Sequence, residues 1–254
     1  MAVKMIDVSY AQGVIDWGRV KASGIAAVMI RATVSYPHLY RGRQLTGIDT
    51  MFKRNIEGAL AAGLDVGVYH YSYALSVAEA RLEAQHLLDT IKPYKLTLPV
   101  ALDFEDPTQV SLSKAQKSAI CVAFLRVVQD AGYFAMLYSM ASWLEHQLTG
   151  AELAQYAKWV AHVGVAKPSY SGSYGIWQYS WTGKVDGVPS TVDCNYMYED
   201  YPTVIKAAGK NGWALEPNLP QEPEPEMVPK AKYKALQTKY NIIVQSIKEL
   251  IGKG

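Results

Sequence analysis

Short apolar runs alternate with longer amphipathic stretches along the first half of the chain. Four of the runs have the length and the Val, Ile and Leu content of buried strands. They are residues 3–8, 26–32, 65–71 and 98–104. Between them, apolar positions recur every three or four residues, which predicts helices at residues 14–22, 49–62 and 77–91. Strands that alternate with helices in this way are typical of a parallel sheet or barrel covered by helices.

The second half of the chain changes this pattern. A long helix is predicted at residues 111–131, with Gly132 at its end, and shorter strands follow at residues 134–138, 158–162, 175–179 and near Val192. The spacers between these strands, such as residues 164–174, are too short and too rich in Gly, Ser and Pro for a full crossover helix. We therefore predict eight strands in an irregular TIM-like β/α barrel that lacks its later helices.

The composition changes again after about residue 213. Residues 214–229 are rich in Pro and Glu, which predicts an extended linker between a barrel at residues 1–213 and a tail at residues 230–254. In the tail, apolar residues with the spacing of a helix seam are Tyr233, Leu236, Tyr240, Ile243, Ile247 and Leu250. Six lysines against one glutamate give this predicted helix a net charge of +5. We expect it to form a homo-oligomer, while docking on an anionic wall or membrane, or on the barrel, stays open.

Composition narrows the function classes. The 254 residues carry a net charge of only +2, which does not point to nucleic acid. Cys121 and Cys194 lack the spacing of metal ligands, and His70 and His162 lack zinc-site neighbours, so no metal is expected. The sequence also shows no P-loop or nucleophile-elbow motif, and we expect no cofactor. The chain start does not resemble a signal peptide, and no run is long enough to span a membrane, so we expect synthesis in a bacterial cytoplasm.

Two carboxylates stand at the end of the run at residues 98–104. Residues i and i+2 of a strand share a face, so Asp103 and Glu105 should project together beyond the strand end. Asp7 ends the first predicted strand and Asp193 lies in the last, and strand ends converge at one face of a parallel barrel. Paired carboxylates in one cleft are typical of glycosidic bond chemistry, although a solvated strand end is the ordinary alternative for each acid.

The order and spacing of several motifs resemble the family 25 glycoside hydrolases, which include the Chalaropsis-type lysozymes and many phage endolysins. The resemblance covers about residues 5–213. The segments that carry it are IDVS (6–9), IDW (15–17), IRAT (30–33), Phe52, Asn55, AAGLDVGVYHYSYA (61–74), ALDFE (101–105), YS (138–139), WVAHV (159–163), WQYS (177–180) and VDCN (192–195).

The resemblance implies a flattened, irregular β/α barrel and a specific activity. It implies hydrolysis, with retention of configuration, of the β-1,4 bond between N-acetylmuramic acid and N-acetylglucosamine in peptidoglycan. Glu105 would be the general acid and base. Asp103 would be either the nucleophile or the group that orients the substrate's 2-acetamido carbonyl, and these two routes stay open. Asp7 and Asp193 correspond to two further acids of the cleft.

Aromatic rings are expected beside such acids because the apolar faces of sugars stack on them. The candidates on predicted strands are Tyr69, Tyr71, Tyr138, Trp159, Trp177 and Tyr179. Core packing explains any single ring about as well, and the resemblance favours Tyr69, Tyr138 and Trp177 for the cleft. Arg31 ends the second strand, where it could hold a carboxylate or lactyl group or form an ordinary surface ion pair.

Several alternatives compete with a peptidoglycan hydrolase. The same acids could cleave another N-acetylated glycan such as chitin. A catalytically inactive barrel could instead bind cell walls, or the chain could be a structural phage component assembled through its tail. For the leading interpretation, an endolysin without a signal peptide would act on the wall after release through a membrane lesion made by a separate holin.

Overall fold

The computed structural model describes residues 2–40, 43–215 and 238–239. The chain divides into two units, Met1–Leu215 and Glu216–Gly254. Apart from residues 214–215 and 238–239, the predicted linker and tail lie outside the described residues. In the described part of the chain, no helix combines the length and apolar character needed to cross a membrane.

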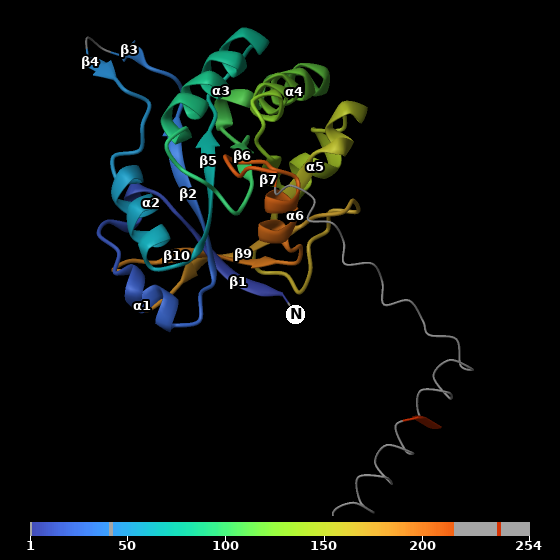
Figure 1. Cartoon of the computed structure of the whole chain (residues 1–254). Helices are drawn as coiled ribbons and strands as arrows, with labels where there is room; N and C mark the ends of the chain where they lie inside the picture. Colours follow the sequence, from blue (N-terminus) through green and yellow to red (C-terminus); the bar gives the residue numbers. More distant parts are fainter. Residues whose placement is uncertain (1, 41–42, 216–237, 240–254) are drawn as a thin grey trace, which may run out of the picture. The chain divides into compact units, whose positions relative to one another are not determined.

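Eight strands of the first unit close into a TIM-like barrel (Figure 1). In order around the barrel they are β1 (Val3–Val8), β10 (Val192–Met197), β9 (Ile176–Gly183), β8 (Ala157–Ala161), β7 (Ala135–Met140), β6 (Val100–Asp103), β5 (Asp65–Tyr71) and β2 (Ala27–Val34). The predicted strands are therefore present, with ends that shift by a few residues.

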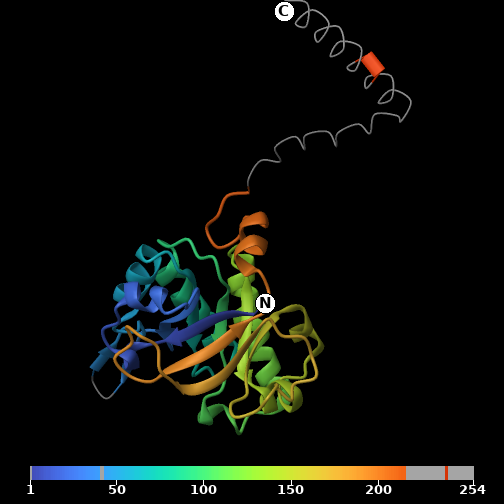
Figure 2. The same cartoon turned by 90° about the horizontal axis from the view of Figure 1, so that it is seen from below.

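One strand departs from a parallel barrel. The pairs from β1 through β2, β5, β6, β7 and β8 to β9 are parallel, whereas β10 runs antiparallel to both β9 and β1. Only residues 184–191 connect β9 to β10, and a connection of this length reaches an antiparallel neighbour but not a parallel one. In Figure 2, β1 and the orange strand β10 lie side by side.

Helices cover the outside of the barrel unevenly. They are α1 (Trp17–Ala22), α2 (Phe52–Ala61), α3 (Val77–Ile91), α4 (Lys114–Asp130), α5 (Ala141–His146) and α6 (Tyr201–Ala207). Helices α2 and α3 contact β2 and β5, α4 contacts β6 and β7, and α5 contacts β7 and β8. The described residues 162–175 and 184–191 contain no helix, as the spacer composition predicts.

Local capping sets several helix ends. The Ser76 side chain accepts from the Glu79 amide and starts α3 at the predicted residue. Helix α2 begins at Phe52, three residues later than predicted, because the Asp49 carboxylate accepts the Met51 amide in the turn before it. The helices α5 and α6 and the hairpin of β3 (His38–Tyr40) and β4 (Arg43–Leu45) were not predicted from the sequence pattern. These elements are too short to show a period.

The barrel interior is apolar at one end and polar at the other. Its apolar cluster includes Met5, Ala27, Met29, Ala101, Met136, Trp159, Ile176 and Met197, with Tyr201 and Ile205 of α6 packed against it. Two residues after Met5, Met29, Ala101 and Ile176, side chains that also point into the barrel are those of Asp7, Arg31, Asp103 and Gln178. A second cluster fills the space between strands and helices. Polar chemistry is thus confined to one mouth of the barrel.

Candidate active site

The four predicted acids come from three strands that meet at this mouth. Asp7 lies near the end of β1, Asp103 ends β6, and Glu105 follows two residues later. Asp193 is the second residue of β10, and because β10 is antiparallel, its start lies beside the end of β1. Asp7 and Asp193 are direct partners in the β1–β10 register. Asp193 thus lies near the other acids, but it does so from the start of its strand, whereas Asp7 and Asp103 lie near the ends of theirs.

Amide side chains hold the acids, and the sequence analysis did not single them out. Gln178 Nε2 donates to Asp7 Oδ2 at 2.9 Å and to Asp193 Oδ2 at 3.2 Å. Its Oε1 accepts from the Tyr138 hydroxyl and from Trp181 Nε1, both at 2.9 Å. Asn195 Nδ2 gives Asp7 Oδ2 a second donor at 2.8 Å. The one signal in the sequence for these amides was a glutamine between two aromatic residues in a predicted strand.

Burial shifts the acidity of all four groups. Burial and the nearby Asp193 carboxylate raise the pKa of Glu105 to about 7, and the same two causes raise the pKa of Asp7 to about 7. Burial raises the pKa of Asp193 to about 6. The pKa of Asp103 lies well above its ordinary value because the group is buried and faces Glu105 and Asp7, with Arg31 opposing this shift. The mouth can therefore hold exchangeable protons near neutral pH.

Asp103 also has an unpaired oxygen. Its Oδ1 is buried and has no hydrogen-bond partner among the described residues. An unsatisfied buried polar atom costs roughly 1–3 kcal/mol. The main chain around it is well held, since Asp103 O accepts the Ser72 amide and Phe104 O accepts the Ser139 hydroxyl. Oδ1 therefore lacks the hydrogen-bond donor that a buried carboxylate oxygen ordinarily has.

Four of the predicted rings lie with or beside the acids. Tyr69 and Tyr138 pack edge to face on Trp159, with centroid separations of 5.9 and 4.5 Å, inside the barrel. Trp159 is almost fully buried, so it supports the mouth from below. The Tyr71 hydroxyl donates to Asp106 Oδ2 at 3.0 Å in the loop after Glu105.

The other two predicted rings are turned away. Trp177 and Tyr179 flank Gln178 in β9, so their side chains lie on the opposite face of the strand. Tyr179 stacks on Tyr196 at 4.5 Å, and Trp177 Nε1 donates to the His162 carbonyl. The structure does not bring this pair to the acids.

Trp181 is an aromatic residue that the pattern analysis missed. Its side chain is bonded to Gln178, yet the residue is 47% exposed. It lines a cavity of about 320 Å³ together with Met140, Ala161 and His162, beyond the ends of β7 and β8. An exposed indole bonded to the glutamine that holds Asp7 and Asp193 is a suitable stacking surface for a sugar ring.

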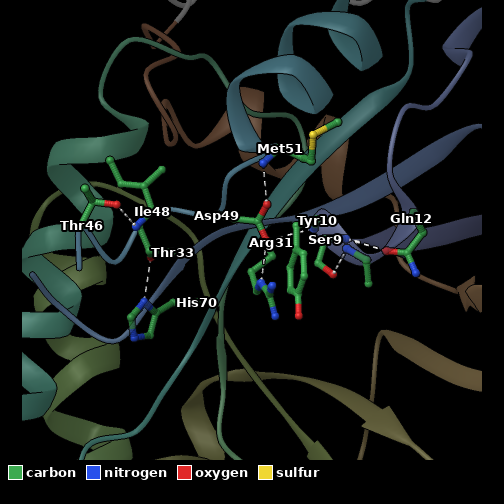
Figure 3. Close-up of polar contacts among 11 residues, drawn as sticks. Ser9, Tyr10, Gln12, Arg31, Thr33, Thr46, Ile48, Asp49, Met51 and His70 are labelled. Atoms are coloured by element: carbon green, nitrogen blue, oxygen red, sulfur yellow. Dashed lines mark hydrogen bonds and ion pairs between the residues drawn. The ribbon is translucent and has the colours of Figure 1, made fainter. Parts of the chain in front are cut away.

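Arg31 extends the site on the side of β2. Its guanidinium bonds to Asp49 and lies over the Tyr10 ring (Figure 3). Cys121 and Cys194 are free and buried. No cluster of three or more His, Cys, Asp or Glu residues suited to a metal ion occurs in the described part of the chain.

Comparisons with known proteins agree on one family. The model of Glycosyl hydrolases family 25 matches residues 6–188. The autolytic lysozyme of Clostridium acetobutylicum is 30% identical over 213 residues, or 83% of this chain and 61% of that protein. This chain thus matches less than two thirds of that relative's length. The lysozyme of Streptococcus phage Cp-1 is 32% identical over 126 residues, or 45% of this chain and 36% of the phage protein.

A solved structure agrees with the fold as well as the sequence. The bacterial lysozyme of Streptomyces coelicolor superposes with a TM-score of 0.66 at 29% identity, covering 82% of this chain and 97% of that one. The family-model match at residues 6–188 includes Asp7, Asp103 and Glu105. This chain belongs to glycosyl hydrolase family 25.

Proposed function

We propose that this chain hydrolyses the β-1,4 bond between N-acetylmuramic acid and N-acetylglucosamine in bacterial peptidoglycan, with retention of configuration. The observation that carries the proposal is Glu105 at the barrel mouth, where burial and Asp193 raise its pKa to about 7. A carboxyl group with this pKa is protonated in a useful fraction of molecules near neutral pH and can serve as a general acid. Family membership and the names of the relatives support the same chemistry.

The reaction proceeds in two steps. Glu105 donates its proton to the glycosidic oxygen as the bond from this oxygen to the anomeric carbon breaks, which releases the leaving sugar. A nucleophile on the opposite face forms a temporary bond to the anomeric carbon. Glu105, now ionised, removes a proton from water as the water oxygen displaces the nucleophile. Two inversions give net retention.

Asp103 acts in one of two ways in this scheme. As a nucleophile it bonds to the anomeric carbon itself, whereas as an orienting group it holds the 2-acetamido group, whose carbonyl oxygen then attacks. The unpaired Oδ1 favours the second route because it can accept the acetamido N–H. A thiazoline analogue of the cyclic intermediate should then inhibit strongly. Trapping of a covalent sugar on Asp103 would establish the first route instead.

The remaining groups position these two. Gln178 bonds to Asp7 and Asp193, Asn195 bonds to Asp7, and burial together with the charge of Asp193 raises the pKa of Glu105. We place the sugar rings against Tyr69, Tyr138 and Trp181, with Tyr71 and Trp159 as supports. Trp177 and Tyr179 have no contact with sugar in this proposal because they lie on the other face of β9.

The test is product analysis on purified Gram-positive cell walls. Wild type should clear the walls and release new reducing ends that are muramic acid, with the anomeric configuration retained. New reducing ends of N-acetylglucosamine, or activity on chitin alone, would reject the proposed bond. If the protein co-sediments with walls without cleaving them, it is a binding module and the proposal fails.

We propose the cell wall as the place of action, reached from the cytoplasm through a membrane lesion made by a holin. One relative is a bacterial autolytic lysozyme and another is a phage lysozyme, so both settings occur among similar proteins. Expression in a susceptible host with and without a holin tests this route. Lysis should require both proteins.

A further inference from the structure

Arg31 is held rigidly at the barrel mouth. Arg31 lies two residues after Met29 in β2, so its side chain points into the barrel as that of Met29 does. Only 16% of the Arg31 side chain is exposed. The guanidinium carbon lies 5.0 Å from the centroid of the Tyr10 ring, within the range of cation–π attraction. Figure 3 shows Arg31 beside this ring and below Asp49, to which it is bonded. An arginine fixed in this way loses little further freedom when it binds a ligand.

Asp49 is the anchor of this arrangement. Its side chain is fully buried, and Oδ2 accepts from Arg31 Nε at 2.8 Å and from the Tyr10 amide at 3.0 Å. Its Oδ1 accepts the Met51 amide at 2.9 Å. Asp49 therefore connects the turn after β1, Arg31 within β2 and the turn before α2. It fixes Arg31 through Nε alone.

The two terminal nitrogens of Arg31 stay available. Among the described residues, no acceptor is bonded to either Nη. A guanidinium bound through Nε keeps N–H donors on both terminal nitrogens, and these match the two oxygens of a carboxylate or a single carbonyl oxygen. Partial burial strengthens such bonds relative to those on an exposed arginine.

The charge of the mouth gives Arg31 a selective role. Burial is the main cause of the raised pKa of Asp103, Glu105, Asp7 and Asp106 raise it further, and Arg31 is the cation that lowers it. An anionic ligand entering this mouth meets several acids, so it needs a cation at its point of entry. Arg31 supplies that cation. The exposed ring of Tyr10 stands beside it.

We propose that Arg31 recognises the acyl oxygens of the lactyl ether that distinguishes N-acetylmuramic acid from N-acetylglucosamine. These oxygens form a carboxylate when the lactyl group is free and include a carbonyl when it carries a peptide. The inference rests on the proposed function, because it places a muramic acid ring beside Asp103 and Glu105. It makes Arg31 a specificity-determining residue that would separate peptidoglycan from chitin.

The test compares two ligands that differ only at this group. One is a tetrasaccharide of alternating N-acetylglucosamine and N-acetylmuramic acid with free lactyl carboxylates, and the other is the same sugar with each carboxylate reduced to an alcohol. The full chain carries Glu105→Gln to prevent cleavage, and calorimetry gives both Kd values. We expect the carboxylate ligand to bind about tenfold more tightly, the gain from a charge-assisted pair of hydrogen bonds.

Variants of Arg31 identify the source of that preference. Adding Arg31→Gln should bring the two Kd values within about twofold, whereas Arg31→Lys, which keeps the charge and loses the fork, should retain about threefold. Arg19→Gln is the matched control, because Arg19 also bonds a carboxylate, that of Asp186, but is exposed and lies on α1. It should keep the full preference. A structural role for Arg31 would instead weaken both ligands equally.

Several results would overturn the inference. Equal Kd values for the two ligands in the Glu105→Gln protein would do so, as would an undiminished preference after Arg31→Gln or binding of neither ligand. Wall digestion by wild type distinguishes failure of the proposed function from failure of the proposed role of Arg31. If no reducing ends are released, the proposed function fails, whereas release of muramic acid ends with equal Kd values rejects only the role of Arg31.

Discussion

Glu83 and Asp103 are carboxylates that this barrel buries at two different sites, and they differ in how they are compensated. Glu83 of α3 is fully buried, yet its oxygens accept from the Ser72 hydroxyl at 2.5 Å and the Tyr73 amide at 3.0 Å. His70 Nε2 lies 3.1 Å from the same carboxylate, and His70 Nδ1 contacts the Thr33 hydroxyl (Figure 3). Asp103 is as well buried, but its Oδ1 has no partner among the described residues.

The difference distinguishes a structural carboxylate from a reactive one. Glu83 fixes the segment after β5, and the Ser72 amide in that segment donates to Asp103 O. The compensated site therefore supports the uncompensated one. At the mouth, two buried acids, Asp7 and Asp103, and two half-buried acids, Glu105 and Asp193, lie close to one another, which costs stability and supplies groups with raised pKa values. Replacing an acid at the mouth should thus reduce activity without loss of stability, whereas replacing Glu83 should reduce stability.

The largest expected effect is on activity at the mouth. Glu105→Gln should reduce the rate of wall hydrolysis by about a thousandfold, because the variant cannot donate the proton. Its thermal midpoint should stay the same or rise, since a buried acid with a raised pKa is replaced by a neutral amide. Release of reducing ends and differential scanning calorimetry measure the two quantities. A large fall in both would show that Glu105 is a structural residue.

The next effect is on stability at the compensated site. Glu83→Ala should lower the free energy of unfolding by about 3 kcal/mol, because it leaves the Ser72 hydroxyl, the Tyr73 amide and His70 without their partner. Urea denaturation measures this loss. Glu57→Ala is the matched control, because Glu57 forms only an exposed pair with Lys53 at 3.9 Å, and it should change stability by less than about 0.5 kcal/mol. Equal losses would remove the distinction between the two sites.

A smaller effect is expected in the pH dependence of stability. Asp7 and Glu105 have pKa values of about 7 in the folded chain, whereas unfolded Asp and Glu titrate near 4. Between pH 4 and pH 7 the folded state thus binds more protons than the unfolded state, and the free energy of unfolding should fall as pH rises. Urea titrations across this range test the slope. Glu105→Gln should make it shallower, and an unchanged slope would place the titrating groups elsewhere.

The smallest effect is expected at Cys194. Its side chain lies on the opposite face of β10 from Asp193 and Asn195, with Sγ 3.7 Å from the Val192 carbonyl. Cys194→Ala should therefore leave the rate of wall hydrolysis within about twofold of wild type. A large loss of rate would mean that the thiol packs under Asp193 and sets its position.

Much of the fold was predictable because its strands and helices have clear periods. The strands at residues 3–8 and 65–71 and the helix at residues 77–91 agree with the structure at both ends. The direction of β10 was not predictable from its residues, because Val, Asp and Cys in a short strand are compatible with either direction. That direction follows from the short connection to β9 and from closure of the barrel against β1.

The acids were easier to find than the groups around them. Asp103 and Glu105 stand out because two charges follow a continuous apolar run, but Gln178 and Asn195 are ordinary strand residues until their partners are known. The side-chain phase of β9 decides between Trp177 and Trp181, and this phase depends on an irregular register between β9 and β10. Glu83 and Asp49 lie in segments that looked like a helix face and a helix start.

The pH dependence of kcat/KM on soluble peptidoglycan fragments would show whether Glu105 is the general acid. If Glu105 is the general acid in a buried mouth, kcat/KM should fall as pH rises with a midpoint of about 7. A fall centred near the ordinary glutamate pKa, about 4.3, would contradict a buried acid at this position. A profile with no fall up to pH 9 would show that Glu105 does not supply the proton.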